Sequence, residues 1–129
     1  MLALRRLALV VHDYDEAIAF YAGVLGFELL EDTSLGGDKR WVRVRAPGGG
    51  ELLLARAVTD DQRARVGTQT GDRVFLFVET DDFEADHARL LARGVRFLEA
   101  PRRESYGTVA VFVDLYGNKI DLIGYAGRG

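Results

Sequence analysis

The two halves of the chain repeat the same order of sequence patterns, and this repetition restricts the fold more than any other feature. Each half begins with a short apolar run, continues through acidic residues into an amphipathic segment, and then reaches a glycine. Equivalent residues lie 67 or 68 positions apart, as in Asp15 with Asp82, Gly26 with Gly94, and Gly49 with Gly117. A constant offset across a chain indicates internal duplication, so both halves are expected to adopt one architecture.

The first half predicts four strands and one helix. Apolar runs rich in branched residues predict the strands at 7–11, 27–31, 41–45 and 51–56. Apolar residues recur at helical spacing from 18 to 25, and Asp13 or Asp15 is placed to cap this helix. Gly26 is expected to end the helix in a left-handed conformation.

The second half repeats this order. Its strands are predicted at 74–78, 95–99, 108–113 and 119–123. A helix is expected to begin after Asp82 and to end at Gly94, with His87 on its apolar face as a packing residue. The polar stretch 58–71 joins the halves, either as a linker or with a short helix around 60–66.

This order of elements predicts an α+β fold built from two tandem βαβββ modules. We expect a single domain over residues 1–129, made of repeats at about 4–57 and 72–125. A chain of 129 residues with 48% hydrophobic residues can bury one ordinary core.

The composition excludes several classes of function. The chain has no cysteine, so disulfides and thiol chemistry are excluded. It has a net charge of −3 and no dense basic stripe, which disfavours nucleic-acid binding. Its apolar runs are too short for a membrane span or a signal peptide. These features predict a cytoplasmic protein.

Two segments resemble the vicinal oxygen chelate superfamily, which includes glyoxalase I, bleomycin-resistance proteins and extradiol dioxygenases. Residues 9–27 resemble its opening, in which a strand, an acidic cap, a helix with a Phe-Tyr pair and a Leu-Gly-Phe exit follow in order. Residues 114–123 resemble its closing motif, a turn with Gly-Asn followed by a strand that carries an acid. Together with the duplication, the resemblance covers nearly the whole chain.

The resemblance implies an arrangement for each half. The strands of each module would curl into a partly open barrel, with the helix on the convex side and a ligand inside. Family members commonly pair, so the resemblance also implies a homodimer. Strand alternation would direct Leu7, Leu9 and Val11, and likewise Val74, Leu76 and Val78, toward the helices.

The family's metal ligands would fall on residues that mostly lack a donor. Carried over position by position, the four metal positions are Arg6, Leu53, Arg73 and Asp121. Arginine stays protonated and leucine offers no lone pair, so only Asp121 can bind a metal. We therefore expect no metal cofactor. The alternative is a divalent metal (Ni, Zn, Mn or Fe) held by Asp121 with Glu51 or His12, if Glu51 slips into the position of Leu53.

Several other residues are predicted to line the ligand cavity that the resemblance implies. Arg6 and Arg73 would converge on Asp121 and replace the metal charge, or bind an anionic ligand, or simply extend into solvent. Further candidates for the lining are Trp41, Arg43, Glu51, Leu53, Phe75, Phe77 and Tyr106. The three rings of Trp41, Phe75 and Phe77 would stack on a ligand or serve only as core.

Three functions follow as hypotheses. The first is a metal-free protein that binds an aromatic or charged small molecule and thereby sequesters it. The second is a metal-dependent glyoxalase, lyase or dioxygenase. The third is a metal-free isomerase or lyase, with Asp121 or His12 as the catalytic base.

Overall fold

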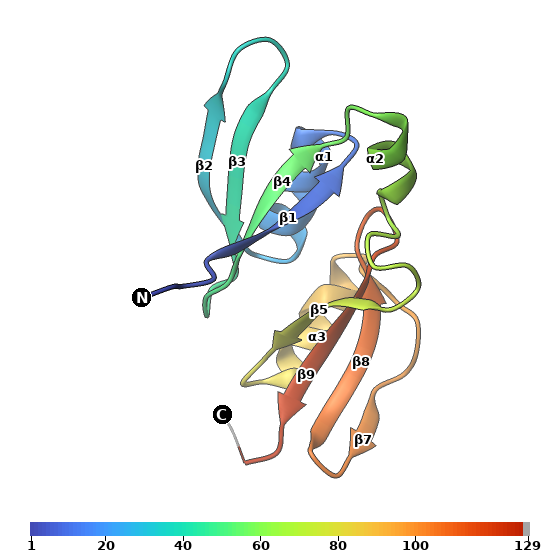
Figure 1. Cartoon of the computed structure of the whole chain (residues 1–129). Helices are drawn as coiled ribbons and strands as arrows, with labels where there is room; N and C mark the ends of the chain where they lie inside the picture. The colour runs from blue at the N-terminus through green and yellow to red at the C-terminus, as the bar shows by residue number, and fades with distance from the viewer. Residues whose placement is uncertain (128–129) are drawn as a thin grey trace. The chain divides into compact units, whose positions relative to one another are not determined.

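The computed structural model describes residues 1–127 and contains two compact units (Figure 1). The first unit spans Met1–Gln69 and the second begins at Thr70. Each unit has one mixed sheet with helices, and neither sheet closes into a barrel within the described residues. The predicted α+β class is therefore confirmed, with an open sheet in each half.

The first unit contains a four-stranded sheet in the order β1-β4-β3-β2. Its strands are β1 (Arg6–Val11), β2 (Glu28–Ser34), β3 (Arg40–Arg45) and β4 (Glu51–Arg56). β1 is parallel to β4, while β3 is antiparallel to both β2 and β4. In this register Arg6 lies opposite Glu51, and Ala8 lies opposite Leu53.

The predicted helix of the first unit changes its winding halfway. α1 (Tyr14–Ile18) begins at the cap residue Asp13, whose carboxylate accepts a hydrogen bond from the Glu16 amide at 2.9 Å. The chain then continues as a π-helix, η1 (Ala19–Val24). Tyr21, which lies in this π-helix, is completely buried.

A short helix follows β4, and Gln69, which comes after this helix, binds the backbone of the edge strand β1. α2 (Asp60–Arg65) is capped by Thr59, so the helical alternative predicted for 60–66 is confirmed. Gln69 donates a hydrogen bond to the Ala8 carbonyl at 2.7 Å and accepts one from the Val10 amide at 2.9 Å. The glutamine amide thus satisfies backbone groups that an edge strand leaves unpaired.

The second unit has a five-stranded sheet in the order β5-β9-β8-β6, with β7 also paired to β8. Its elements are β5 (Val74–Glu79), α3 (Phe83–Ala92), β6 (Arg96–Phe97), β7 (Arg102–Glu104), β8 (Gly107–Val113) and β9 (Lys119–Tyr125). α3 packs against β9, and His87 stacks on Phe83 and contacts Phe97, as predicted for a packing residue (Figure 1).

The predicted strand at 95–99 is wrong in extent, and β7 was not predicted. The sheet edge here is split into the short strands β6 and β7 on either side of Pro101. Proline has no amide hydrogen for the ladder, so a continuous strand cannot pass through this position.

Two predictions about strand faces also need correction. Leu7 was expected to pack under the helix but is 45% exposed, because it lies near the start of an edge strand. The second prediction is the strict alternation of Val74, Leu76 and Val78 along β5. The register of β5 shifts between Val74 and Leu76, so Phe75 is an extra residue at a bulge and interrupts this alternation. Beyond the bulge, Phe77 lies opposite Asp121.

The turn between β8 and β9 is built around Asp114. One carboxylate oxygen accepts hydrogen bonds from the amides of Tyr116, Gly117 and Asn118 at 2.9–3.0 Å, and the other accepts one from the Asn118 side chain at 2.9 Å. Gly117 has a φ of +104°, which favours glycine. The closing motif seen in the sequence therefore fixes a turn.

Candidate functional site

A network of four charged side chains lies on the face of the first sheet that carries Arg6 and Leu53. We call Arg6, Glu31, Arg43 and Glu51 the Glu51 network. Arg43 donates to Glu51 at 2.6 Å and to Glu31 at 3.0 Å, and Arg6 donates to the same Glu51 oxygen at 3.3 Å. The strand register explains this cluster, because Arg6 lies opposite Glu51 and Arg43 opposite Glu31.

The electrostatics of this network favour its charged form. The hydrogen bond from Arg43, followed by the weaker one from Arg6, holds the pKa of Glu51 below its usual value against the opposing effect of burial. The same bonds to Glu51 and Glu31 raise the pKa of Arg43. Glu51 is thus an ionised anchor for two guanidinium groups, and its Oε1 atom is already engaged by both.

Asp121 provides the corresponding feature of the second unit. Its Oδ1 atom is buried and has no hydrogen-bond partner among residues 1–127. Burial is the main cause that raises the pKa of Asp121, while the charge of Arg102 lowers it and that of Glu99 raises it. Beside it, the Phe77 side chain is 67% exposed. An apolar ring and an unsatisfied acceptor therefore lie together; we call Phe77, Glu99, Arg102 and Asp121 the Asp121 face.

The other two members of this face are held by β7 and β8. Arg102 donates to Glu99 at 2.7 Å and to Glu104 at 2.7 Å, and the Val111 amide donates to Glu99 at 3.0 Å. Val111 lies opposite Asp121. The Arg102 guanidinium is consequently committed to two carboxylates other than Asp121.

The structure brings together only some of the predicted site residues. Arg6, Arg43 and Glu51 meet in the first unit, and Phe77 and Asp121 meet in the second. β4 pairs with β1 in an unbroken register that places Glu51 opposite Arg6 and Leu53 opposite Ala8, and the slip of Glu51 into the position of Leu53 stays a prediction. The convergence of Arg6 and Arg73 on Asp121 would join both units and stays a prediction.

The remaining predicted residues are not members of these two clusters. His12 is exposed at the bend after β1, and Arg73 is exposed just before β5. Trp41 is half-buried on β3, opposite Thr33, and Leu53 is half-buried on β4. Phe75 is half-buried at the bulge. Tyr106 is exposed in the turn before β8, with its ring 6.1 Å from that of Tyr125.

Three charged residues of these clusters were missed from the sequence. Glu31 joins Arg43 only because a register irregularity in β2 brings the two opposite each other. Glu99 and Arg102 lie on either side of Pro101, where the sheet edge is split, and their charges act on the pKa of Asp121. The one signal in the sequence is the spacing of Glu99 and Arg102, which suits a local ion pair.

The donor set does not fit the metal that the resemblance implies. Within residues 1–127 no group of three or more His, Cys, Asp or Glu side chains is placed to hold a metal ion. Arg6 donates to Glu51, and that carboxylate already accepts from two guanidinium groups. These residues therefore do not provide the set of donor atoms that a divalent metal needs.

Comparison with known proteins identifies the class. Residues 3–122 match the Glyoxalase/Bleomycin resistance protein/Dioxygenase superfamily, and the chain belongs to this family. It is 54% identical over 120 residues to an uncharacterized protein of Shewanella frigidimarina (strain NCIMB 400), covering 91% of this chain and 89% of that protein.

Two solved structures share the fold. UcmS2 is 28% identical, with a TM-score of 0.80, and covers 95% of this chain and 98% of its own. TnmS3, described as an antibiotic binding protein from Streptomyces sp. CB03234, is 30% identical, with a TM-score of 0.77 and 98% of each chain covered. The described part of the chain also has no helix long and apolar enough to cross a membrane.

Proposed function

We propose that this protein binds a small aromatic compound that carries a hydrogen-bond donor, without a metal and without chemical turnover. The observation that carries the proposal is the pairing of an exposed Phe77 ring with the unsatisfied, buried oxygen of Asp121. The antibiotic-binding description of TnmS3 supports the same class of function.

The energetics of the Asp121 face favour a ligand of this kind. A buried acceptor without a partner costs about 1–3 kcal/mol, and a ligand hydroxyl or ammonium group that donates to it recovers this cost. An aromatic ligand that covers Phe77 removes apolar area from water at about 25 cal/mol per Å². Both contributions are available in one place, which is typical of a binding surface with a few polar anchors.

The Glu51 network supports the metal-free part of the proposal. A metal ion at this position would have to displace two guanidinium groups from Glu51 and would be repelled by their charges. We expect less than about a tenth of an equivalent of Ni, Zn, Mn or Fe by inductively coupled plasma mass spectrometry. Near one equivalent of any of them would instead favour a metal-dependent glyoxalase, lyase or dioxygenase.

The binding test uses doxorubicin, a planar aromatic compound with phenolic hydroxyls and an ammonium group, followed by its own fluorescence polarisation. We expect binding that weakens at least ten-fold in Asp121→Leu and in Phe77→Ala. The matched control is Asp61→Leu, which removes an exposed carboxylate on α2. Equal affinities in all four proteins would overturn the proposed site. Anthraquinone-2-sulfonate, which lacks a donor, is expected to bind weakly.

A metal-free isomerase or lyase is the second candidate, since burial raises the pKa of Asp121 and makes it a stronger base. This reaction class predicts accelerated exchange of the methyl protons of pyruvate in D₂O, measured by NMR. Exchange at the buffer rate supports binding alone. Acceleration that disappears in Asp121→Asn but not in His12→Asn would make Asp121 the base.

We also propose that the protein acts as a homodimer, as the family resemblance implies. Light scattering coupled to size-exclusion chromatography tests this, and a monomer mass of 14.3 kDa at micromolar concentration would contradict it.

A further inference from the structure

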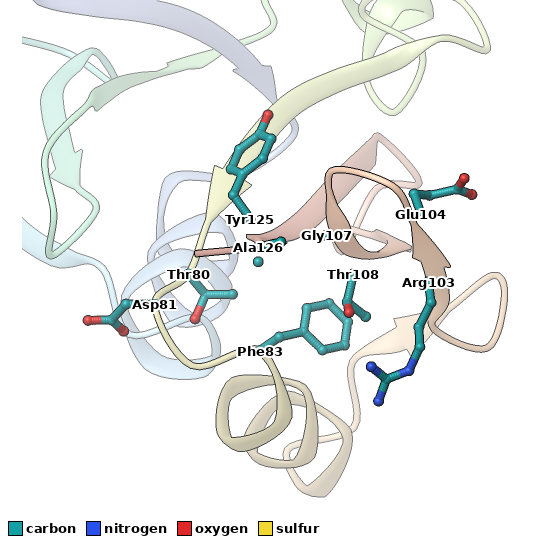
Figure 2. Close-up of a pocket in the computed structure, with 10 residues that line it drawn as sticks. Thr80, Asp81, Phe83, Arg103, Glu104, Gly107, Thr108, Tyr125 and Ala126 are labelled. Carbon is teal, nitrogen blue, oxygen red and sulfur yellow. The ribbon is translucent and has the colours of Figure 1, made fainter. Parts of the chain in front are cut away.

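A hollow of about 410 Å³ lies in the second unit, lined by residues of β7, β8, β9 and the start of α3 and by none of the four residues of the Asp121 face (Figure 2). Arg103, Thr108 and Gly124 form a row across β7, β8 and β9, since Arg103 pairs with Thr108 and Thr108 with Gly124. Gly124 is three positions from Asp121 on β9, so strand alternation places the two on opposite faces. The hollow is therefore separate from the site proposed above.

Gly124 has no side chain, and Phe83 packs closely against it. A Cβ atom at this position would lie 3.0 Å from the Cβ atom of Phe83, which is tighter than ordinary packing. Phe83, at the start of α3, instead lines the bare strand with its ring, which is stacked on His87 at 5.5 Å between centroids. Gly124 and Phe83 both line the hollow, and Figure 2 shows the Phe83 ring among the lining side chains.

Arg103 supplies the hollow with a positive charge, and Asp81 and Glu104 also belong to its lining. Within residues 1–127 the Arg103 guanidinium makes no ion pair, whereas the adjacent Arg102 pairs with both Glu99 and Glu104. Alternation along β7 sends Arg102 and Glu104 to the other face of the sheet. Figure 2 shows the Arg103 side chain extending toward the side where the Phe83 ring lies, and the carboxylates of Asp81 and Glu104 pointing away from the hollow.

We infer that this hollow binds a small planar aromatic carboxylate. Its ring would lie against Phe83, and its carboxylate would accept two parallel hydrogen bonds from the Arg103 guanidinium, a pairing that this group's geometry favours. The Thr108 hydroxyl, which lies next to Arg103 in the row, would donate a further hydrogen bond. A volume of 410 Å³ lies within the range of small-molecule sites.

The test is a titration of ¹⁵N-labelled protein with sodium benzoate, followed by the amide resonances. We expect saturable shifts at Gly107, Thr108 and Gly124, and none near Phe77. Arg103→Gln is expected to weaken binding at least ten-fold, and Thr108→Val two- to five-fold. The matched control, Arg96→Gln, removes an exposed arginine elsewhere in the same unit and should leave the affinity unchanged.

Two further probes define the ligand class. Benzylamine has the same ring with a positive charge, and it should not shift these resonances. Inorganic phosphate has the charge without the ring, and it should bind at least ten-fold more weakly than benzoate. Phe83→Leu should remove most of the advantage of benzoate over phosphate.

Several results would overturn the inference. Binding of benzoate that is unaffected by Arg103→Gln, or the absence of any saturable shift, excludes the site. Phosphate that binds as well as benzoate would show a general anion site and not one for aromatic carboxylates. Shifts confined to the neighbourhood of Phe77 and Asp121 would assign benzoate to the proposed functional site, whose own test with doxorubicin is independent of this one.

Discussion

Phe77 and Asp121 lie directly opposite each other on the parallel strands β5 and β9; Phe77 is 67% exposed, and the Oδ1 atom of Asp121 is buried without a hydrogen-bond partner among residues 1–127. A folded protein rarely leaves a buried acceptor without a hydrogen-bond partner. Burial of Asp121 without a hydrogen-bond donor is a local cost to stability, and its size depends on pH because only the ionised form carries the full penalty.

The first prediction concerns this pH dependence. The pKa of Asp121 is raised in the folded protein, so the folded state binds more protons than the unfolded state between the unfolded pKa of about 3.8 and the higher folded value. Asp121 therefore destabilises the protein progressively as pH rises through this window. Asp121→Asn should gain stability relative to the wild type from pH 3.5 upward and then level off, as measured by urea unfolding.

Asp61→Asn is the control for that experiment, since this exposed carboxylate on α2 forms only a long ion pair at 3.9 Å. The difference for Asp121→Asn should change more with pH than that for this control. A difference for Asp121→Asn that changes no more than that for Asp61→Asn would contradict the burial of the unpartnered Asp121 Oδ1 atom.

Glu51 should show the opposite sign. Its pKa is lowered mainly by the hydrogen bond from Arg43, so its stabilising effect is present above the unfolded pKa of about 4.5 and is lost as pH falls through the folded value. Glu51→Gln should therefore be less stable than the wild type at pH 7 and approach it below pH 4. Thermal unfolding from pH 3 to pH 7 measures the difference, and added NaCl should reduce it because the network is partly exposed. A difference that grows toward low pH would contradict this assignment.

The repeat in the sequence was sufficient to predict the architecture, because each half buries its own apolar strand faces against its own helix. β4 was predicted with its observed bounds, and Asp13 was one of two predicted caps for α1. The pairing of Arg6 with Glu51 follows from parallel strands of fixed register. The bulge at Phe75 and the split strand at Pro101 were not predictable, since both depend on how one strand meets its neighbour and local propensity carries no information about that.

Gly107 should be far less tolerant of substitution than Gly48. A Cβ atom at Gly107 would overlap the carbonyl oxygen of Gly124, and the φ of +150° at Gly107 disfavours a side chain as well. Gly107→Ala should cost about 3 kcal/mol or more in the free energy of unfolding, because the obstacle is backbone and cannot rotate away. Gly48→Ala, which meets nothing within 4 Å, should change stability by less than about 0.5 kcal/mol. Equal costs in urea unfolding would mean that β8 and β9 do not approach this closely.

Asp114 is predicted to be a structural residue and not part of a binding site. Its carboxylate is only 4% exposed and accepts four hydrogen bonds that close the turn between β8 and β9. Asp114→Ala would leave three backbone amides and the buried Asn118 side chain without their acceptor, at a cost of about 3 kcal/mol in the free energy of unfolding.

β9 carries Asp121 on one face and Gly124 on the other. Asp114 belongs to neither binding site, so Asp114→Ala should weaken doxorubicin and benzoate binding only through the unfolded fraction. Affinities measured at 10 °C, where the variant remains folded by circular dichroism, should match those of the wild type. A direct loss of affinity in the fully folded variant would place Asp114 in one of the binding sites and contradict its purely structural role.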